Sequence, residues 1–249
     1  MKKINKKTLS IVILILFIFT SKVYGMPDGS ILDLTTDNND YSISIKIMLL
    51  FTLLTLMPAI LMTMTSFTRI IIVLHFVRSS VGTQQTPPNQ VLIGLALFLT
   101  LFIMTPIASE INTEAIQPYL NDEINQDEVI EKGLEPIRNF MFKQTESKDL
   151  ALFLDIAEIN ETENMKIEDI PTKVLIPSFI IGEIKKAFKM GFIIYIPFLV
   201  IDMVVASTLM SMGMMMLPPV MISLPFKLLL FVMVDGWDLV IKSLVLGFN

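Results

Sequence analysis

Two long uncharged apolar runs constrain this chain more than any other feature. Residues 47–67 form 21 successive positions without a charged side chain, and residues 91–109 form 19. A helix rises about 1.5 Å per residue, so each run spans about 30 Å, the thickness of the hydrocarbon core of a bilayer. We therefore predict two helices that cross a membrane.

The composition supports a membrane protein and excludes several other classes. Of 249 residues, 53% are hydrophobic and 17% charged, whereas a soluble domain has about 25% charged residues. The absence of Cys and the single His75 exclude disulfides, thiolate metal sites and a His pair that binds a metal. A net charge of −5 gives no basic surface for nucleic acid. We predict no cofactor, no metal site and no catalytic residue.

The N-terminus has the pattern of a signal peptide. Residues 2–7 contain four Lys, and residues 9–19 form an apolar run before Gly25. We predict cleavage after Gly25, which makes residues 1–25 a signal peptide and residues 26–46 an exported segment. The alternative is an uncleaved anchor, but an 11-residue run spans only about 16 Å.

Charge predicts how the middle of the chain is organised. Residues 68–90 contain Arg69, His75 and Arg78 and no acidic residue, so we predict a short cytoplasmic-side loop within a first helical hairpin over 47–109. Residues 110–172 contain 16 acidic and 5 basic residues, a net charge of −11. They predict a periplasmic region of two or three short amphipathic helices. Its acidic surface is either simply solvated or a docking face for a partner.

Residues 173–249 are apolar but are interrupted by charges and prolines. An ionised side chain in a lone lipid-facing helix costs about 2.5–3.5 kcal/mol, so these charges require shielding by protein or water. We predict a bent helical hairpin packed inside an oligomer. Four charges are predicted to be buried there, for assembly or gating: Glu183, Asp202, Lys227 and Asp235.

Counting residues from a turn at Pro218 and Pro219 predicts how far along its helix each of these charges lies from the turn. Asp202 precedes the turn by 16 residues and Lys227 follows it by 8, a difference of about 12 Å along a helix. We therefore expect their partners to lie on other subunits. Asp235 is 16 residues beyond Pro219, which would place its carboxylate level with that of Asp202.

Three methionines, Met214, Met215 and Met216, stand beside the turn. Gly213, Pro218 and Pro219 are expected to end one helix and reverse the chain. Flexible, polarizable thioethers can seal against one another, although a Met run is more often core filling. The spacings Ala187-x-x-x-Gly191 and Ser207-x-x-x-Ser211 allow close contacts between helices.

Two stretches of the last third resemble the signatures of a known family. They are PSFIIGEIKKAFKMGF at 177–192 and PFLVIDMVVASTLMSMGMMMLPP at 197–219, and they are similar to the FliP family. The likeness extends to LPFKLLLF at 224–231, VDGW at 234–237, TSFTRIIIVL at 65–74 and QQTPPNQ at 84–90. Ser178 and Gly182 depart from the residues that the family more often has.

The resemblance implies an all-α, membrane-associated protein of the flagellar type III export gate in the bacterial inner membrane. Bent helical hairpins and a small acidic periplasmic helical region would assemble into a helical pore complex. In the family, five copies of FliP combine with FliQ and FliR, with FlhB and FlhA on the cytoplasmic side. The pore conducts unfolded flagellar subunits, and Met214, Met215 and Met216 would form its methionine gasket. The signal peptide and the 63-residue loop favour the flagellar member over its injectisome counterpart.

Two other functions remain as alternatives. Broken helices and intramembrane charges are also typical of a subunit of a secondary ion or small-solute transporter, but no inverted repeat is found. An intramembrane enzyme is disfavoured by the lack of Cys and of a second His.

Overall fold

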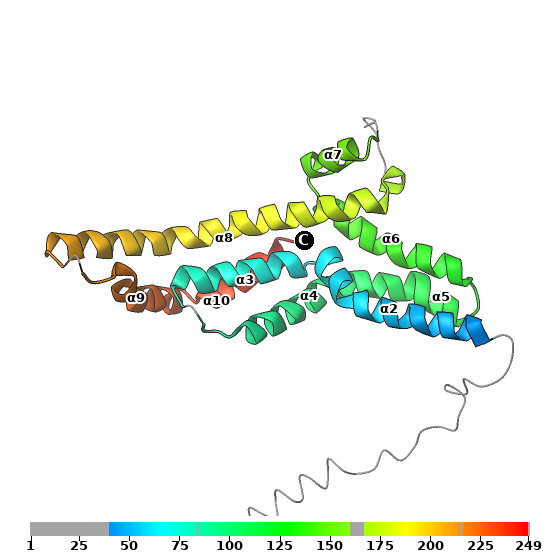
Figure 1. Cartoon of the computed structure of the whole chain (residues 1–249), viewed down its shortest axis with the longest axis horizontal. Coiled ribbons are helices and arrows are strands. Elements are labelled where there is room, and N and C mark those ends of the chain that lie inside the picture. The colour runs from blue at the N-terminus through cyan, green and yellow to red at the C-terminus, as the bar shows by residue number, and fades with distance from the viewer. Residues whose placement is uncertain (1–39, 84, 160–166, 215, 249) are drawn as a thin grey trace, which may run out of the picture. The chain divides into compact units, whose positions relative to one another are not determined.

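The computed structural model describes residues 40–83, 85–159, 167–214 and 216–248, and their regular structure is helical (Figure 1). The predicted signal peptide, most of the exported segment and Met215 lie outside these residues. The chain divides into two compact units, Met1–Thr55 and Leu56–Asn249, and the described part of the first is the beginning of helix α2.

The described helices differ widely in length, from a single turn to 40 residues. They are α2 (Asp40–Met64), α3 (Phe67–Val81), α4 (Asn89–Ile111), the π-helical turn η1 (Asn112–Ile116), α5 (Gln117–Leu120), α6 (Gln126–Gln144), α7 (Ser147–Ile156), the 3-10 turn η2 (Ile167–Asp169), α8 (Thr172–Ser211), α9 (Pro219–Met233) and α10 (Gly236–Leu246).

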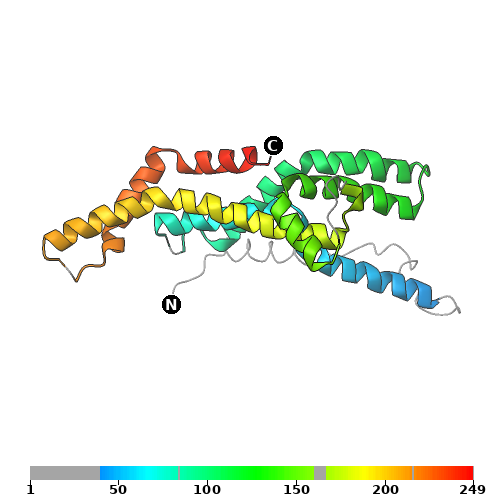
Figure 2. The same ribbon diagram turned by 90° about the horizontal axis from the view of Figure 1, so that it is seen from above.

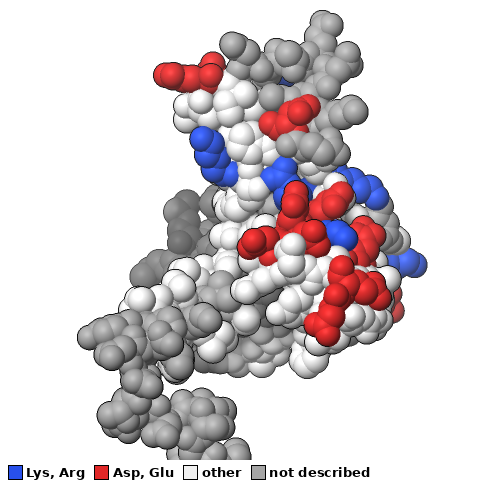
Figure 3. Space-filling model, turned by 90° about the vertical axis from the view of Figure 1, so that its right-hand side faces the viewer, with Lys and Arg blue, Asp and Glu red and all other residues white. Residues whose placement is uncertain are grey.

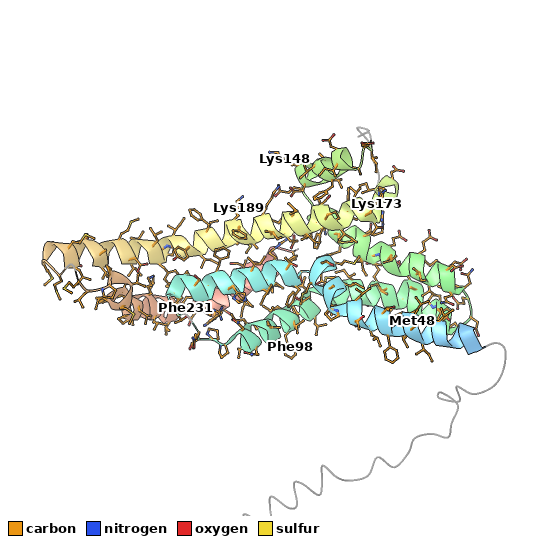
Figure 4. The ribbon with its side chains drawn as sticks, viewed as in Figure 1. Met48, Phe98, Lys148, Lys173, Lys189 and Phe231 are labelled. Atoms are coloured by element: carbon orange, nitrogen blue, oxygen red, sulfur yellow. The ribbon has the colours of Figure 1, made fainter. Side chains whose placement is uncertain are left out.

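Three helical segments are long and apolar enough to cross a membrane: Ile47–Met64, Asn89–Leu120 and Thr172–Ser211. The all-helical class is therefore confirmed for the described residues, with three candidate membrane-spanning segments. The second segment is longer than predicted, because α4 continues through η1 and α5. The acidic region, predicted from residue 110, thus begins inside a helix. Figure 4 shows Phe98 on the outer side of α4, where it is exposed.

The predicted loop over 68–90 is wrong, because most of it is helix α3. Ile70, Val73, Leu74 and Val77 are buried, and their i, i+3, i+4, i+7 spacing is that of a helix with one apolar face. This face packs along α8 and α4 (Figure 1). Only residues 82–88 connect α3 to α4. The positive charge of residues 68–90 had suggested a surface loop. The helical spacing of their apolar residues instead determines the structure.

The helices α3 and α8 approach closely at the predicted Ala187-x-x-x-Gly191 pattern. Both small residues are buried, and a Cβ on Gly191 would lie 2.4 Å from the ring of Phe76. The rings of Phe76 and Phe188 meet edge to face, with centroids 5.1 Å apart. In contrast, Ser207 and Ser211 are exposed in the single chain.

Replacing Gly191 with Ala is expected to destabilise the chain by about 1–3 kcal/mol, the typical cost of overpacking a core. The backbone of α8 or the Phe76 ring must shift, because the added methyl group has no room. Thermal unfolding of the detergent-extracted protein measures the effect. Gly94→Ala is the matched control, since a Cβ there meets nothing within 4 Å. Equal melting of the two variants would contradict this close contact.

The second arm of the predicted C-terminal hairpin is two helices instead of one. Helix α9 packs back along α8, and Asp235, with φ of 49°, separates α9 from α10. Figure 2 shows α10 as a distinct helix that leads to the C-terminal end. Phe231 of α9 is buried at this junction (Figure 4), 5.4 Å from Trp237 and 6.3 Å from Phe198 between ring centroids.

Acidic side chains gather at the connection between α5 and α6. Figure 3 shows Asp and Glu concentrated on this end of the molecule. Asn125 caps α6 by accepting hydrogen bonds from the backbone N–H of Asp127 and of Glu128, and the Glu128 side chain accepts from the N–H of Asn125. This capping box stabilises the start of an amphipathic helix. The predicted periplasmic location of the region remains a prediction.

Candidate functional site

The connection between α8 and α9 is built around Gly213. Its N–H donates to the carbonyl of Met210, and the N–H of Met214 donates to the carbonyl of Leu209, both at 3.0 Å. This pair of hydrogen bonds is a Schellman motif, which ends a helix with one left-handed residue. Gly213 has φ of 76°, a conformation that glycine adopts without the steric cost of a side chain.

The predicted methionine site lies on this connection. Met214 and Met216 are exposed in the single chain, while Met215 is outside the described residues. Pro218 precedes α9 and Pro219 is its first residue, where proline's missing N–H costs no helical hydrogen bond. The arrangement is a short turn that carries unbranched apolar side chains, and the described residues leave these side chains exposed.

A charged pair joins α8 to α9 behind the turn, and it corrects the sequence analysis. The Nζ of Lys227 lies 2.6 Å from Oδ2 of Asp202, and the Ser223 hydroxyl donates to Oδ1 of the same carboxylate. The side chain of Lys227 is 3% exposed and that of Asp202 is 26% exposed. The prediction that these two residues find partners only on other subunits is therefore wrong.

The error came from counting the whole connection as helix. Helix α8 ends at Ser211 and helix α9 begins at Pro219. Asp202 therefore lies 9 residues from the end of α8, and Lys227 lies 8 from the start of α9, which places them level. The same correction moves Asp235 about 10 Å from the height of Asp202 along the helix direction. Asp235 is exposed in the single chain, so its predicted burial in an assembly stays a prediction.

Lys227 also lies at the end of α3. A Cβ on Gly82, the left-handed residue that ends α3, would be 3.9 Å from the Lys227 Nζ. A cation near the C-terminus of a helix interacts favourably with its exposed carbonyl groups. One ammonium group thus lies where α3, α8 and α9 meet.

The predicted buried charge Glu183 pairs with a residue that we had not predicted as a partner. The Arg69 guanidinium binds both carboxylate oxygens of Glu183, with Nε 2.8 Å from Oε2. Arg69 is 2% exposed and Glu183 0%. A bidentate pair of this kind combines charge with two hydrogen bonds. The sequence signal was present, since an arginine inside the apolar helix 67–77 needs a counter-charge.

The C-terminal end of the described chain completes this buried cluster. Arg69 donates to the carbonyl of Gly247 at 2.9 Å and to Oε1 of Gln144 at 3.1 Å. The guanidinium carbon lies 3.7 Å from the ring centroid of Phe248. Gln144 in turn donates to the Phe248 carbonyl at 3.2 Å. The cluster therefore holds α3, α6, α8 and the end of α10 together.

Arg78 fixes the connection between α3 and α4. It donates to Oδ1 of Asn89 at 2.6 Å and to the Pro87 carbonyl at 3.2 Å, and its Nη2 lies 2.9 Å from Nδ1 of His75. Burial and the neighbouring Arg78 guanidinium lower the pKa of His75 below its ordinary value. His75 is therefore neutral at pH 7, so its Nδ1 is able to accept from Arg78.

Charged pairs held between packed helices, in a chain with three helical segments long and apolar enough to cross a membrane, are typical of a helical membrane protein. Among the described residues, no group of three His, Cys, Asp or Glu side chains could hold a metal ion.

Comparison with known proteins identifies the family. The profile of the FliP family matches residues 50–244. Flagellar biosynthetic protein FliP of Bacillus subtilis (strain 168) is 58% identical over 214 residues, which cover 86% of this chain and 96% of the relative. The proteins of the same name from Pectobacterium carotovorum and Aquifex aeolicus are 51% and 48% identical, over 86% and 83% of this chain and 83% and 86% of their own lengths. The chain belongs to the FliP family, which confirms the resemblance.

Proposed function

We propose that this chain is a structural pore subunit of the flagellar type III protein export gate. Several copies, five by the family resemblance, would assemble with FliQ and FliR in the bacterial inner membrane, next to FlhB and FlhA. The pore would conduct unfolded flagellar subunits, with no catalytic step in this chain. Membership of the FliP family and the flagellar names of its relatives support this role.

The observation that carries the pore hypothesis is the exposed methionine turn. Met214 and Met216 lie on a connection that begins at a Gly213 Schellman motif, and both are exposed in the part of the chain that the structure describes. Burying a Met side chain contributes about 1.5–3 kcal/mol. Turns from several copies therefore gain stability by closing on one another, and their flexible thioethers can remould around a passing chain.

The Asp202–Lys227 pair is compatible with this role and does not by itself exclude the transporter alternative. Paired charges occur in transporters too, but a transporter of this kind also has an inverted repeat, and none is found in the sequence. Here Lys227 is already bound to Asp202 within one chain. We propose that the pair fixes α9 against α8, so that the turn is presented by a rigid hairpin.

Replacing Met214, Met215 and Met216 together with Ala is expected to raise the conductance of the assembled complex to small ions. The substitution removes the apolar surface that closes the pore while leaving the Schellman motif and the charged pair in place. A planar-bilayer recording measures the leak, and single replacements should leak less because other Met layers remain. If the assembled triple variant leaks no more than the parent, the gasket hypothesis is wrong and the three Met side chains only fill a core.

A further inference from the structure

A cavity of about 310 Å³ lies between α4, α6 and the end of the described chain. Glu110 of α4 and Lys143 of α6 line it, together with apolar side chains that include Ile103, Ile107 and Phe248. Ligand pockets in proteins have volumes from about 300 Å³ upward. We propose that this cavity binds the headgroup of phosphatidylethanolamine, a zwitterionic phospholipid, with its ammonium group at Glu110 and its phosphate at Lys143.

Glu110 and Lys143 carry opposite charges that have no partner within the described part of the chain. Among the described residues, no hydrogen bond or ion pair involves either of these two side chains. The two side chains line one cavity, yet they form no ion pair with each other. A ligand that carries one positive and one negative group can provide a charge-assisted hydrogen bond to each of them.

The packing of α6 on the α4 segment places the two charges at different levels. A Cβ on Gly133 of α6 would lie 3.7 Å from the Cβ of Ala115 and 4.0 Å from the Cγ2 of Ile111. The chain reverses between α5 and α6, so α6 runs back along α4 (Figure 1). Counting about 1.5 Å per residue from the Gly133 contact places Lys143 about 10 Å from the level of Glu110, toward the middle of α4. A single small ion would reach only one of these side chains, whereas an ammonium group joined to a phosphate by a short chain can reach both.

The position of the cavity along α4 favours a lipid over a soluble zwitterion. Residues 91–109 are uncharged, and Glu110 is the first charged residue after them. The segment Asn89–Leu120 is long and apolar enough to cross a membrane. The cavity therefore extends from an apolar part of this segment, at Ile103 and Ile107, to its first charge. A phospholipid has its groups in the same order, since its acyl chains are followed by the phosphate and then by the ammonium group.

Headgroup chemistry distinguishes phosphatidylethanolamine from two other common phospholipids. Its primary ammonium group donates charge-assisted hydrogen bonds to a carboxylate such as that of Glu110. The quaternary ammonium group of phosphatidylcholine has no N–H to donate. Phosphatidylglycerol carries no positive charge, so its phosphate could bind Lys143 while Glu110 stayed without a partner.

Native mass spectrometry of the full chain in its detergent-extracted complex tests this site. Phosphatidylethanolamine and phosphatidylglycerol are added in turn, and the fraction of the complex that retains each lipid is measured. We expect the parent to bind phosphatidylethanolamine about tenfold more tightly, which is a typical contribution of one charged hydrogen bond. Glu110→Gln should remove most of this preference. Lys143→Gln should weaken the binding of both lipids, and Lys143→Arg should retain it.

Two matched variants control for the loss of a charge as such. Glu114→Gln and Lys132→Gln remove exposed charges of η1 and α6 that do not line the cavity, and both should bind the lipids as the parent does. Equal binding of the two lipids by the parent, or a preference that survives Glu110→Gln, would overturn the proposal. Binding of free phosphoethanolamine as tight as that of the lipid would overturn the lipid as the occupant.

Thermal unfolding of the same complex gives a second measurement. A ligand that binds only the folded protein raises its melting temperature as the ligand concentration rises. We expect this rise for the parent with phosphatidylethanolamine and a much smaller one for Glu110→Gln, Lys143→Gln. An equal rise for both chains would contradict the site. None of these outcomes bears on the pore hypothesis, which the conductance of the triple Ala complex tests.

Discussion

Glu183→Gln is expected to leave little folded protein. The substitution keeps the shape of the side chain but removes the charge that binds Arg69, whose guanidinium is 2% exposed. Breaking a buried pair by neutralising one partner costs about 3–5 kcal/mol, a large part of the 5–15 kcal/mol that typically stabilises a folded protein. The loss should appear as a lowered melting temperature of the extracted chain and a lower amount in membranes.

Two further variants make this test specific. Glu135→Gln, an exposed acid of α6, should change stability by less than about 0.5 kcal/mol. The double variant Arg69→Met, Glu183→Met removes both charges of this buried pair and should be more stable than Glu183→Gln alone. A Glu183→Gln chain that melts with the parent would show that the Arg69–Glu183 contact does not hold the core together.

Asp202→Asn is expected to cost about 3 kcal/mol, because it leaves the ammonium group of Lys227 buried without a counter-charge. The side chain of Lys227 is 3% exposed and lies 2.6 Å from Asp202, so water replaces the lost partner poorly. The stability of the extracted complex gives the cost. The stability should fall together with assembly, since α9 would lose its ion pair with α8.

A double-mutant cycle separates this pair from its surroundings. Lys227→Met removes the buried charge itself, so the double variant Asp202→Asn, Lys227→Met should be more stable than Asp202→Asn alone. The parent, the two single variants and the double variant together give a coupling energy, which measures the interaction between Asp202 and Lys227. Strictly additive effects would mean that Asp202 and Lys227 do not interact within the folded chain.

Local patterns in the sequence were sufficient for much of this structure. The uncharged runs predicted the apolar helices, because length and composition alone decide whether a helix can span a bilayer. Gly213 and the two prolines indicated the reversal after α8, since their backbone preferences act within a few residues. The approach of α3 to Gly191 likewise follows from two small side chains four residues apart.

Contacts between distant residues could not be predicted in this way. Arg69 and Glu183 are separated by 114 positions, and Gln144 and Phe248 by 104, so no local period connects them. The position of Lys227 relative to Asp202 depended on where α8 ends and α9 begins, and these ends lie at Ser211 and Pro219 instead of meeting at one turn. Helix α3 was missed because its charges were given more weight than its apolar face.

The central claim is that turns from several copies meet at one constriction, and disulfide cross-linking at the turn tests it most directly. The chain contains no Cys, so Met216→Cys introduces a single thiol, which can bridge only to another whose Cα is within about 7 Å. Leu120→Cys at the end of α5 is the control, since Leu120 is also exposed, at 73% against 98% for Met216. We predict disulfide-linked dimers for Met216→Cys and none for Leu120→Cys in membranes that hold the assembled gate. A Met216→Cys chain that stays monomeric in an assembled gate under oxidation would contradict the account.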